Sequence, residues 1–262
     1  MLTPPMSQPT TPSHILGVRV IGVIDLKAGK AVHARGGTRE QYAPVQSALL
    51  SPGLIGDAPA LARAYRDVGI EEIYVADLDR ITRAGDSSSA VAAVAEVGLP
   101  LLVDAGTSDV REAAAVLEAG AARVVIGLET LSSMHDLRDI IAKVGRARVV
   151  FSLDLRGHRT VTRSDGELDQ ITPVELTTRA VDVGVQSILL LDLSRVGQSR
   201  GPDVALVRAI RARASGSELL VGGGIRSADD LTALARAGCN GALVATAVHD
   251  GSLIVAGGDP VV

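Results

Sequence analysis

Aromatic side chains are nearly absent from this 262-residue sequence, which contains one Phe, three Tyr and no Trp. A core without aromatic rings must be built from aliphatic residues, and the composition is 47% hydrophobic. Small branched residues suit parallel strands that are covered by alanine-rich helices. The composition therefore favours an α/β protein with one large domain or two small ones.

Cysteine is nearly absent as well, and the sequence has neither an excess of positive charge nor a long apolar run. A single cysteine, Cys239, excludes an intramolecular disulfide framework and indicates a cytoplasmic protein. The formal net charge of −4 provides no basic field that would attract nucleic acid. No apolar run reaches the length that is needed to span a bilayer. We therefore expect neither nucleic acid nor a membrane as a partner.

The two ends of the chain differ from the rest in their expected structure. Residues 1–16 are rich in Pro, Ser and Thr and lack the regions of a signal peptide, which predicts a disordered extension. Residues 253–262 are expected to form a C-terminal tail. The folded domain is therefore predicted to cover residues 17–252.

Strand-like and helix-like segments alternate through this domain. Apolar runs typical of buried strands end near Asp25, Asp77, Asp104, Gly127, Asp154, Asp192, Gly222 and Ala245. Helical patterns between them cover residues 58–68, 110–119, 134–143, 174–183, 204–214 and 228–237. Eight such units predict a (β/α)8 TIM barrel with its active site at the C-terminal ends of the strands. A doubly wound open sheet is the alternative, but it explains the strand count less well.

An internal repeat divides the predicted barrel into two similar half-barrels. Residues 101–127 align without gaps with residues 219–245. Residues 76–85 match the segment that begins at Leu191 in the same way. Duplicated half-barrels place strands 1 and 5 opposite each other across the barrel mouth. Few residues follow Ala247, so the eighth helix is expected to be short.

Two aspartates occupy equivalent places in the two halves. Asp25 and Asp154 each follow a short apolar run and precede a glycine turn. Carboxylates at strand ends in a barrel mouth are placed for acid and base catalysis on two faces of a substrate. A lone aspartate at such a place would more often cap the following turn. The symmetric pair predicts that Asp25 and Asp154 are catalytic.

A glycine turn at Gly222, Gly223 and Gly224 follows the seventh predicted strand and precedes a capped helix. Bare backbone N–H groups near a helix N-terminus bind anions, and this is the usual phosphate site of such barrels. A tight turn that requires positive φ is the purely structural alternative. The remaining residues predicted to bind phosphate or substrate lie at other strand ends or in the first loop: Ala245, Thr246, Asp104, Gly127, Asp192 and Arg35. No ligand spacing indicates a metal, and we expect no cofactor.

Five motifs carry a resemblance to a known family: VIDLKAGKAV, SLDLRG, LDLSRVGQSRG, LLVGGGIRSADDL and GALVATAVHDG. They resemble the histidine-biosynthesis barrels, which include the HisA isomerase and the HisF cyclase. The resemblance covers residues 18–252 and implies a barrel built from two half-barrels. It also implies a cofactor-free Amadori rearrangement, with Asp25 and Asp154 as the acid–base pair and a phosphate held by residues 222–224 and 245–246.

The sequence departs from the HisA pattern at two turns. HisA has a glycine turn in both halves, whereas the first-half turn here is Asp104-Ala105-Gly106. HisA has Asp-Gly-Thr after strand 6, whereas this chain has Val196-Gly197-Gln198. With these departures, the sequence resembles the HisA-related proteins whose genes occur with one-carbon and methanopterin genes in methanogens and methylotrophs.

Several functions therefore stay open. The first is a HisA-like sugar-phosphate isomerase that acts on a phosphorylated aminoaldose. The second is a HisA-related enzyme of one-carbon cofactor synthesis with a different monophosphate substrate, or a HisF-like cyclase or lyase. The third is a non-catalytic barrel. The expected partner is a small phosphorylated substrate, and we expect a monomer or small homo-oligomer without a glutaminase.

Overall fold

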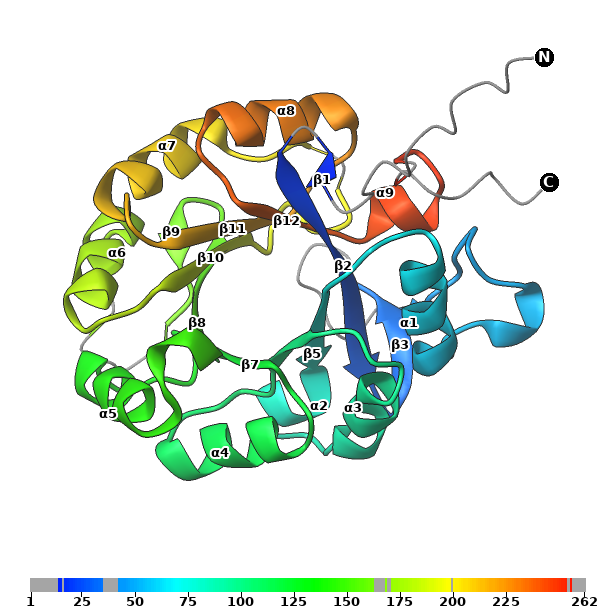
Figure 1. Cartoon of the computed structure of the whole chain (residues 1–262), viewed down its shortest axis with the longest axis horizontal. Coiled ribbons are helices and arrows are strands. Elements are labelled where there is room, and N and C mark those ends of the chain that lie inside the picture. Colours follow the sequence, from blue (N-terminus) through cyan, green and yellow to red (C-terminus); the bar gives the residue numbers. More distant parts are fainter. Residues whose placement is uncertain are drawn as a thin grey trace, which may run out of the picture.

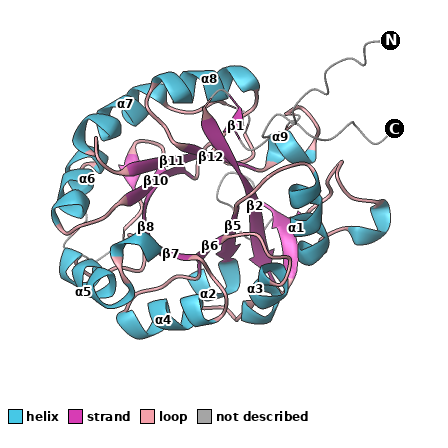
Figure 2. Cartoon of the chain, viewed as in Figure 1, coloured by secondary structure: helices cyan, strands magenta, loops and turns pink. Residues whose placement is uncertain are grey.

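The computed structural model describes residues 14–15, 17–34, 42–162, 168, 171–198, 200–253 and 255. Neighbouring parallel strands pair in sequence order, and the last of them pairs with β2 through Gly241 and Arg19, which closes the sheet. Figure 1 and Figure 2 show the closed ring of strands with helices around it. The predicted (β/α)8 barrel is thereby confirmed. Its strands are β2 (Val18–Lys27), β5 (Ile73–Asp77), β6 (Leu101–Asp104), β7 (Arg123–Gly127), β8 (Val149–Arg156), β10 (Ser187–Asp192), β11 (Glu218–Gly222) and β12 (Gly241–Val244).

Most of the helices begin after a residue whose side chain caps the first turn, although α3 and α9 do not. Asp57, Ser133 and Ser227 each accept a backbone N–H from the first turn of the helix that follows. The six predicted helices are present, each within one residue of the expected ends, and α9 is the predicted short eighth helix. The helices of the described residues are α1 (Ala58–Asp67), α2 (Leu78–Ile81), α3 (Ser88–Ala95), α4 (Val110–Glu118), α5 (Met134–Val144), α6 (Pro173–Asp182), α7 (Val204–Arg213), α8 (Ala228–Arg236) and α9 (Thr246–His249).

Short strands and short helices are added to the eight barrel strands. A hairpin joins β2 to β3 (Lys30–His33), which pairs with β4 (Ala43–Pro44), and β9 (Arg159–Thr160) pairs with β8. The short helices η2 (Pro52–Leu54) and η3 (Arg146–Arg148) precede α1 and β8. Strand β1 (His14–Ile15) pairs with the start of β2, so two residues of the predicted N-terminal extension join the sheet. The other residues of that extension lie outside the described part of the chain.

Alternating side chains of the strands fill two separate apolar layers. On β5, Tyr74 and Ala76 face the inside of the barrel, whereas Ile73 and Val75 pack against the helices. The inner layer below the mouth is aliphatic, and its members are Ile21, Leu102, Val125, Val150, Leu189 and Leu220. The barrel is therefore closed beneath its mouth, and a substrate can enter only from the C-terminal ends of the strands. No helix among the described residues has both the length and the apolar character to cross a bilayer.

Four charged side chains meet at the opposite end of the barrel, where the strands begin. Arg19 and Arg123 alternate with Glu72 and Glu218, with N–O distances of 2.5 to 3.3 Å. Burial alone would raise the pKa of Glu218, but the guanidinium of Arg123 and donors from Ser187 and Arg19 outweigh it and hold that pKa below its usual value. We call these four residues the basal ion ring.

Candidate active site

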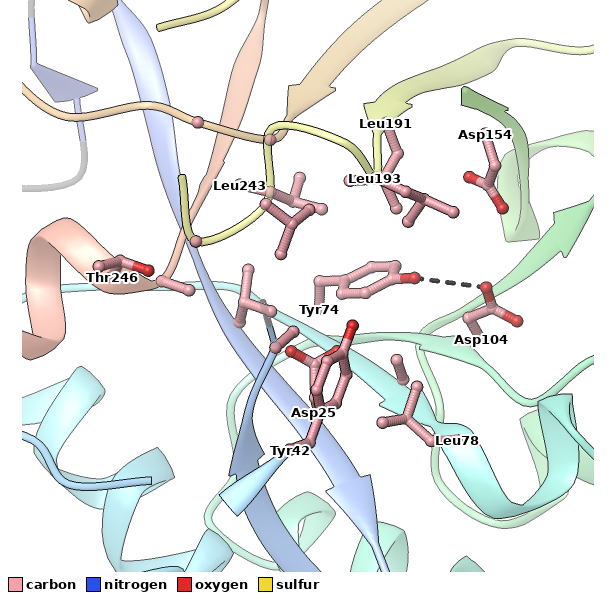
Figure 3. A pocket seen from close by; sticks show the side chains of 18 of the residues that line it. Asp25, Tyr42, Tyr74, Leu78, Asp104, Asp154, Leu191, Leu193, Leu243 and Thr246 are labelled. Atoms are coloured by element: carbon pink, nitrogen blue, oxygen red, sulfur yellow. Dashed lines mark hydrogen bonds between the residues drawn. The ribbon is translucent and has the colours of Figure 1, made fainter. Parts of the chain in front are cut away.

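A pocket occupies the barrel mouth at the C-terminal ends of the strands (Figure 3). Each of the eight barrel strands, or the loop directly after it, contributes to its lining. One residue from each in chain order is Asp25, Tyr74, Asp104, Glu129, Asp154, Leu191, Gly223 and Leu243. The pocket is therefore assembled from the whole chain, as the barrel prediction requires.

Asp25 and Asp154 both line this pocket. They come from β2 and β8 and point into the cavity from different sides (Figure 3). Asp154 is 4% exposed, and its Oδ1 accepts a hydrogen bond of 2.6 Å from the buried hydroxyl of Ser152. A Cβ atom at Gly127 would lie 3.5 Å from Asp154 Oδ2, so the glycine leaves room beside this carboxylate. The structure thus brings the two predicted catalytic residues into one pocket.

Asp104 is a third carboxylate of the pocket and is 6% exposed. It lies in the same register row as Asp25, with Ala76 of β5 between them. Its Oδ1 accepts the backbone N–H of Gly106 at 3.1 Å, and its Oδ2 accepts the hydroxyl of Tyr74 at 3.3 Å. In the first-half turn, the backbone N–H of Gly106 therefore donates to a carboxylate of the protein itself, that of Asp104.

Tyr74 stands among all three carboxylates, and sequence reasoning did not single it out. Burial, followed by the charges of Asp104, Asp154 and Asp25, raises the pKa of Tyr74 well above its usual value. The phenol consequently stays protonated and acts as a fixed hydrogen-bond donor. One signal was available in the sequence, because Tyr74 is one of only three tyrosines and lies in a buried strand of small residues.

The glycine turn after β11 is the second-half counterpart of the Asp104 turn. Gly223 and Gly224 have φ angles of +101° and +80° and line the pocket. A Cβ atom at Gly223 would overlap the carbonyl oxygen of Asp192, so this close approach requires glycine. Ala245 and Thr246 line the same side of the pocket. Five of the predicted binding residues therefore line one pocket: Asp104, Gly223, Gly224, Ala245 and Thr246.

Three further predicted residues, Gly127, Gly222 and Asp192, do not line the pocket, and Gly127 lies beside Asp154. Gly222 packs behind the turn against Leu191 and does not line the pocket. Asp192 also lies outside it, and its carboxylate accepts hydrogen bonds from Ser194 and from Arg195 Nε at 2.8 Å. Arg35 lies outside the described residues.

Asp77, at the end of β5, and Asp79, in α2, hold loops together. Asp77 accepts the backbone N–H groups of Arg80 and Ser87, and Asp79 accepts the N–H of Ala28 in the β2–β3 turn. Within the described ranges, no group of three His, Cys, Asp or Glu side chains is placed to hold a metal ion.

Two histidines connect Thr246, a predicted phosphate-binding residue, to the loop that contains Ser47. His33 Nε2 lies 3.0 Å from Thr246 Oγ1, and the ring of His33 contacts the ring of His249 edge-on at 5.8 Å. His249 is buried, with Ser47 Oγ 3.3 Å from Nδ1 and the hydroxyl of Tyr65 3.4 Å from Nε2. The side chain of Thr246 is thereby linked through His33 to the buried ring of His249.

Acidification is expected to destabilise the fold through His249. Burial, with a smaller contribution from nearby His33, lowers the pKa of His249 to about 4. Since the ordinary pKa is about 6.5, the unfolded chain binds more protons between these values, and stability falls as the pH falls through this window. Urea unfolding should show a loss of roughly 2 kcal/mol from this group between pH 7 and pH 5.

The control for this prediction is an exposed histidine. His249→Gln should flatten the stability curve between pH 5 and pH 7, whereas His135→Gln should leave its slope unchanged, because His135 lies on the surface of α5. Equal slopes for wild type and His249→Gln would contradict the assignment.

Comparisons with known proteins agree with this architecture. The family model described as "Histidine biosynthesis protein" matches residues 19–254. A relative from Deinococcus radiodurans is 32% identical over 237 residues, which are 90% of this chain and 95% of that protein. A relative from Thermus thermophilus is 30% identical over 237 residues, 90% of this chain and 96% of that protein.

Both relatives are named 1-(5-phosphoribosyl)-5-((5-phosphoribosylamino)methylideneamino) imidazole-4-carboxamide isomerase. An uncharacterized protein of Methanocaldococcus jannaschii is 29% identical over 239 residues, 90% of this chain and 95% of that protein. These comparisons confirm the predicted resemblance to the histidine-biosynthesis barrels and the prediction of an isomerase. This chain therefore belongs to the histidine-biosynthesis protein family, whose model matches residues 19–254.

Proposed function

We propose that this protein is a phosphoribosyl isomerase that converts a phosphorylated aminoaldose into the corresponding aminoketose. One observation carries the proposal: Asp25 and Asp154 enter one pocket from β2 and β8, and a glycine turn forms another part of its wall. The names of the relatives from Deinococcus radiodurans and Thermus thermophilus support the same reaction class.

The reaction needs only proton transfers at two places on the sugar. One aspartate, acting as an acid, gives a proton to the ring oxygen as the bond between C1 and that oxygen breaks, which leaves an iminium ion. The other, acting as a base, removes the proton from C2, and the electron pair of that C–H bond neutralises the iminium. The resulting enaminol then tautomerises to the ketose. Two carboxylates on different sides of the sugar provide the acid and the base for these steps.

The phosphate of the substrate is assigned to the turn at Gly223 and Gly224 and to the segment at Ala245 and Thr246. Backbone N–H groups approach an anion closely only where side chains are absent, and a Cβ atom at Gly223 has no room. The hydroxyl of Thr246, positioned by His33, supplies a side-chain donor. A phosphate held there fixes the sugar with its reacting carbons between the aspartates.

An isomerisation assay on two substrates tests the proposal. The first is the bisphosphate substrate for which the relatives are named, and the second is an N-aryl ribosylamine 5-phosphate; ketose formation is followed by absorbance and by NMR. Conversion of at least one of them to its ketose is the expected result. The proposal of an isomerase would be rejected if the folded protein converted neither compound at substrate concentrations well above the dissociation constants.

A further inference from the structure

We propose that Asp192 and Arg195 are positioning residues, which hold the turn at Gly223 and Gly224 in the shape that binds the phosphate of the substrate. This inference rests on the proposed function, because it concerns the phosphate site that was assigned there. Neither Asp192 nor Arg195 lines the pocket at the barrel mouth. Both therefore act through the backbone of the loop after β10, without touching the substrate.

The glycine turn after β11 has little rigidity of its own. Gly223 and Gly224 have no side chains, and their φ angles of +101° and +80° lie in a region that glycine enters and leaves readily. Backbone N–H groups bind an anion well when their directions are fixed beforehand, because ordering a loose turn during binding costs free energy. The turn consequently needs a contact from another part of the chain.

The loop after β10 supplies this contact through a chain of hydrogen bonds. The carboxylate of Asp192 accepts Nε of Arg195 at 2.8 Å, and Nη1 of Arg195 donates to the carbonyl oxygen of Gly201 at 2.8 Å. The N–H of Gly201 then donates to the carbonyl oxygen of Gly224 at 3.0 Å. The side chains of Asp192 and Arg195 are 13% and 25% exposed, so water competes only partly with their charged pair.

The same loop packs closely against the turn. A Cβ atom at Gly223 would overlap the carbonyl oxygen of Asp192, and a Cβ atom at Gly224 would lie 3.0 Å from Cβ of Arg195. Gly201 is in turn close to Arg226, whose Nη2 would lie 3.0 Å from a Cβ atom added there. The glycines thus allow two loops to meet backbone to backbone, and loss of the Arg195 side chain would free the turn to move.

The other end of this chain of hydrogen bonds is anchored at β8. Oδ1 of Asp192 accepts the N–H and the hydroxyl of Ser194 at 3.0 and 2.6 Å. Oγ of Ser194 accepts the backbone N–H of Gly157 at 3.3 Å, and Gly157 directly follows the strand that carries Asp154. Asp192 therefore ties the loop after β10 to a neighbouring barrel strand, so that Arg195 projects from a fixed base.

Titration calorimetry of the whole chain with ribose 5-phosphate tests the inference without requiring turnover. Arg195→Met should weaken binding about tenfold, because the turn loses a charge-assisted contact that orders it in advance. Arg195→Lys can replace only one of the two donors and should lose about threefold. Asp192→Asn, which keeps the side-chain size, should also lose about threefold. Unchanged affinity in Arg195→Met and Asp192→Asn would overturn the inference, as would a wild type that does not bind ribose 5-phosphate at millimolar concentrations.

Arg211 provides the matched control for a purely structural loss. It also donates to backbone carbonyl oxygens, those of Gly238, Ala214 and Ser217, at 2.7 to 3.0 Å, but these residues precede β11 and β12 at the opposite end of the barrel. Arg211→Met should lower the stability measured by urea unfolding and leave the affinity for ribose 5-phosphate unchanged. Equal weakening of binding in Arg211→Met and Arg195→Met would show a general loss of structure and would overturn the inference.

Turnover separates this inference from the proposed function. On a substrate that the wild type converts, Arg195→Met should raise KM about tenfold and lower kcat less than about threefold, because the two catalytic aspartates are unchanged. A wild type that converts neither substrate, with weakened ribose 5-phosphate binding in Arg195→Met, would reject the isomerase and uphold the positioning role. An active wild type, with both constants unchanged in Arg195→Met, would uphold the isomerase and reject the positioning role.

Discussion

Replacement of either Asp25 or Asp154 by asparagine is expected to lower kcat for ketose formation by about 1,000-fold or more. Asparagine keeps the size of the side chain but can neither give nor take the proton, and general acid–base catalysis typically contributes 10²- to 10⁴-fold to the rate. The KM should change by much less, because phosphate binding is assigned to the turn at Gly223 and Gly224 and not to the two aspartates. Steady-state kinetics on whichever substrate the wild type converts measures both constants.

The double variant gives this prediction a sharper form. If Asp25 and Asp154 act on the same reaction, removing both should cost little more than removing one, because each single change already stops the sequence of proton transfers. Asp86→Asn provides the matched control, as an exposed aspartate that does not line the pocket. Retention of more than a tenth of wild-type kcat in either single variant would show that the acid–base assignment is wrong.

Replacement of Arg123 by methionine is expected to lower the free energy of unfolding by about 3 kcal/mol. Removing one partner from a largely buried charge cluster is costly because the remaining charges are left uncompensated. Arg123 bridges Glu72 and Glu218 at the base of the barrel, and its side chain is 15% exposed. Without it, two carboxylates share only Arg19. Urea unfolding at neutral pH measures the change.

The pH dependence distinguishes a charge effect from lost packing. The pKa of Glu218 is lowered in the folded state, so its contribution is present above the ordinary pKa of about 4.5 and is lost as the pH falls through the folded value. The deficit of the Arg123→Met variant should therefore shrink below about pH 4.5. A deficit that is constant with pH would indicate packing alone.

A surface ion pair serves as the control for this ring. Arg179 pairs with Glu175 one turn apart on α6, where both side chains are exposed by more than a third. Arg179→Met should cost less than about 0.5 kcal/mol, because exposed pairs are screened by water and salt. Equal losses in the two variants would contradict the special role of the basal ion ring.

The sequence alone determined the alternation of elements and the two halves of the barrel. Helix α4 spans Val110–Glu118 where residues 110–119 were predicted, because its apolar spacing and the Asp109 cap act within a few residues. Helix α3 belongs to one of the eight predicted strand–helix units, but its bounds were not predicted, since its run of alanines and valines has little amphipathic contrast. Strand-end Asp25 and Asp154 were likewise visible, because strand direction follows from the βαβ pattern.

Only the tertiary structure decided what surrounds these groups. Asp192 occupies a predicted strand end, yet its carboxylate is held by Ser194 and Arg195 outside the main pocket. Tyr74 became part of the site because closure of the barrel brings β5 beside β2 and β6. The basal ion ring unites residues as distant as Arg19 and Glu218. Spacing in the sequence fixes which face of an element a residue occupies, whereas its partners across a closed barrel come from remote segments and depend on the packing of the whole chain.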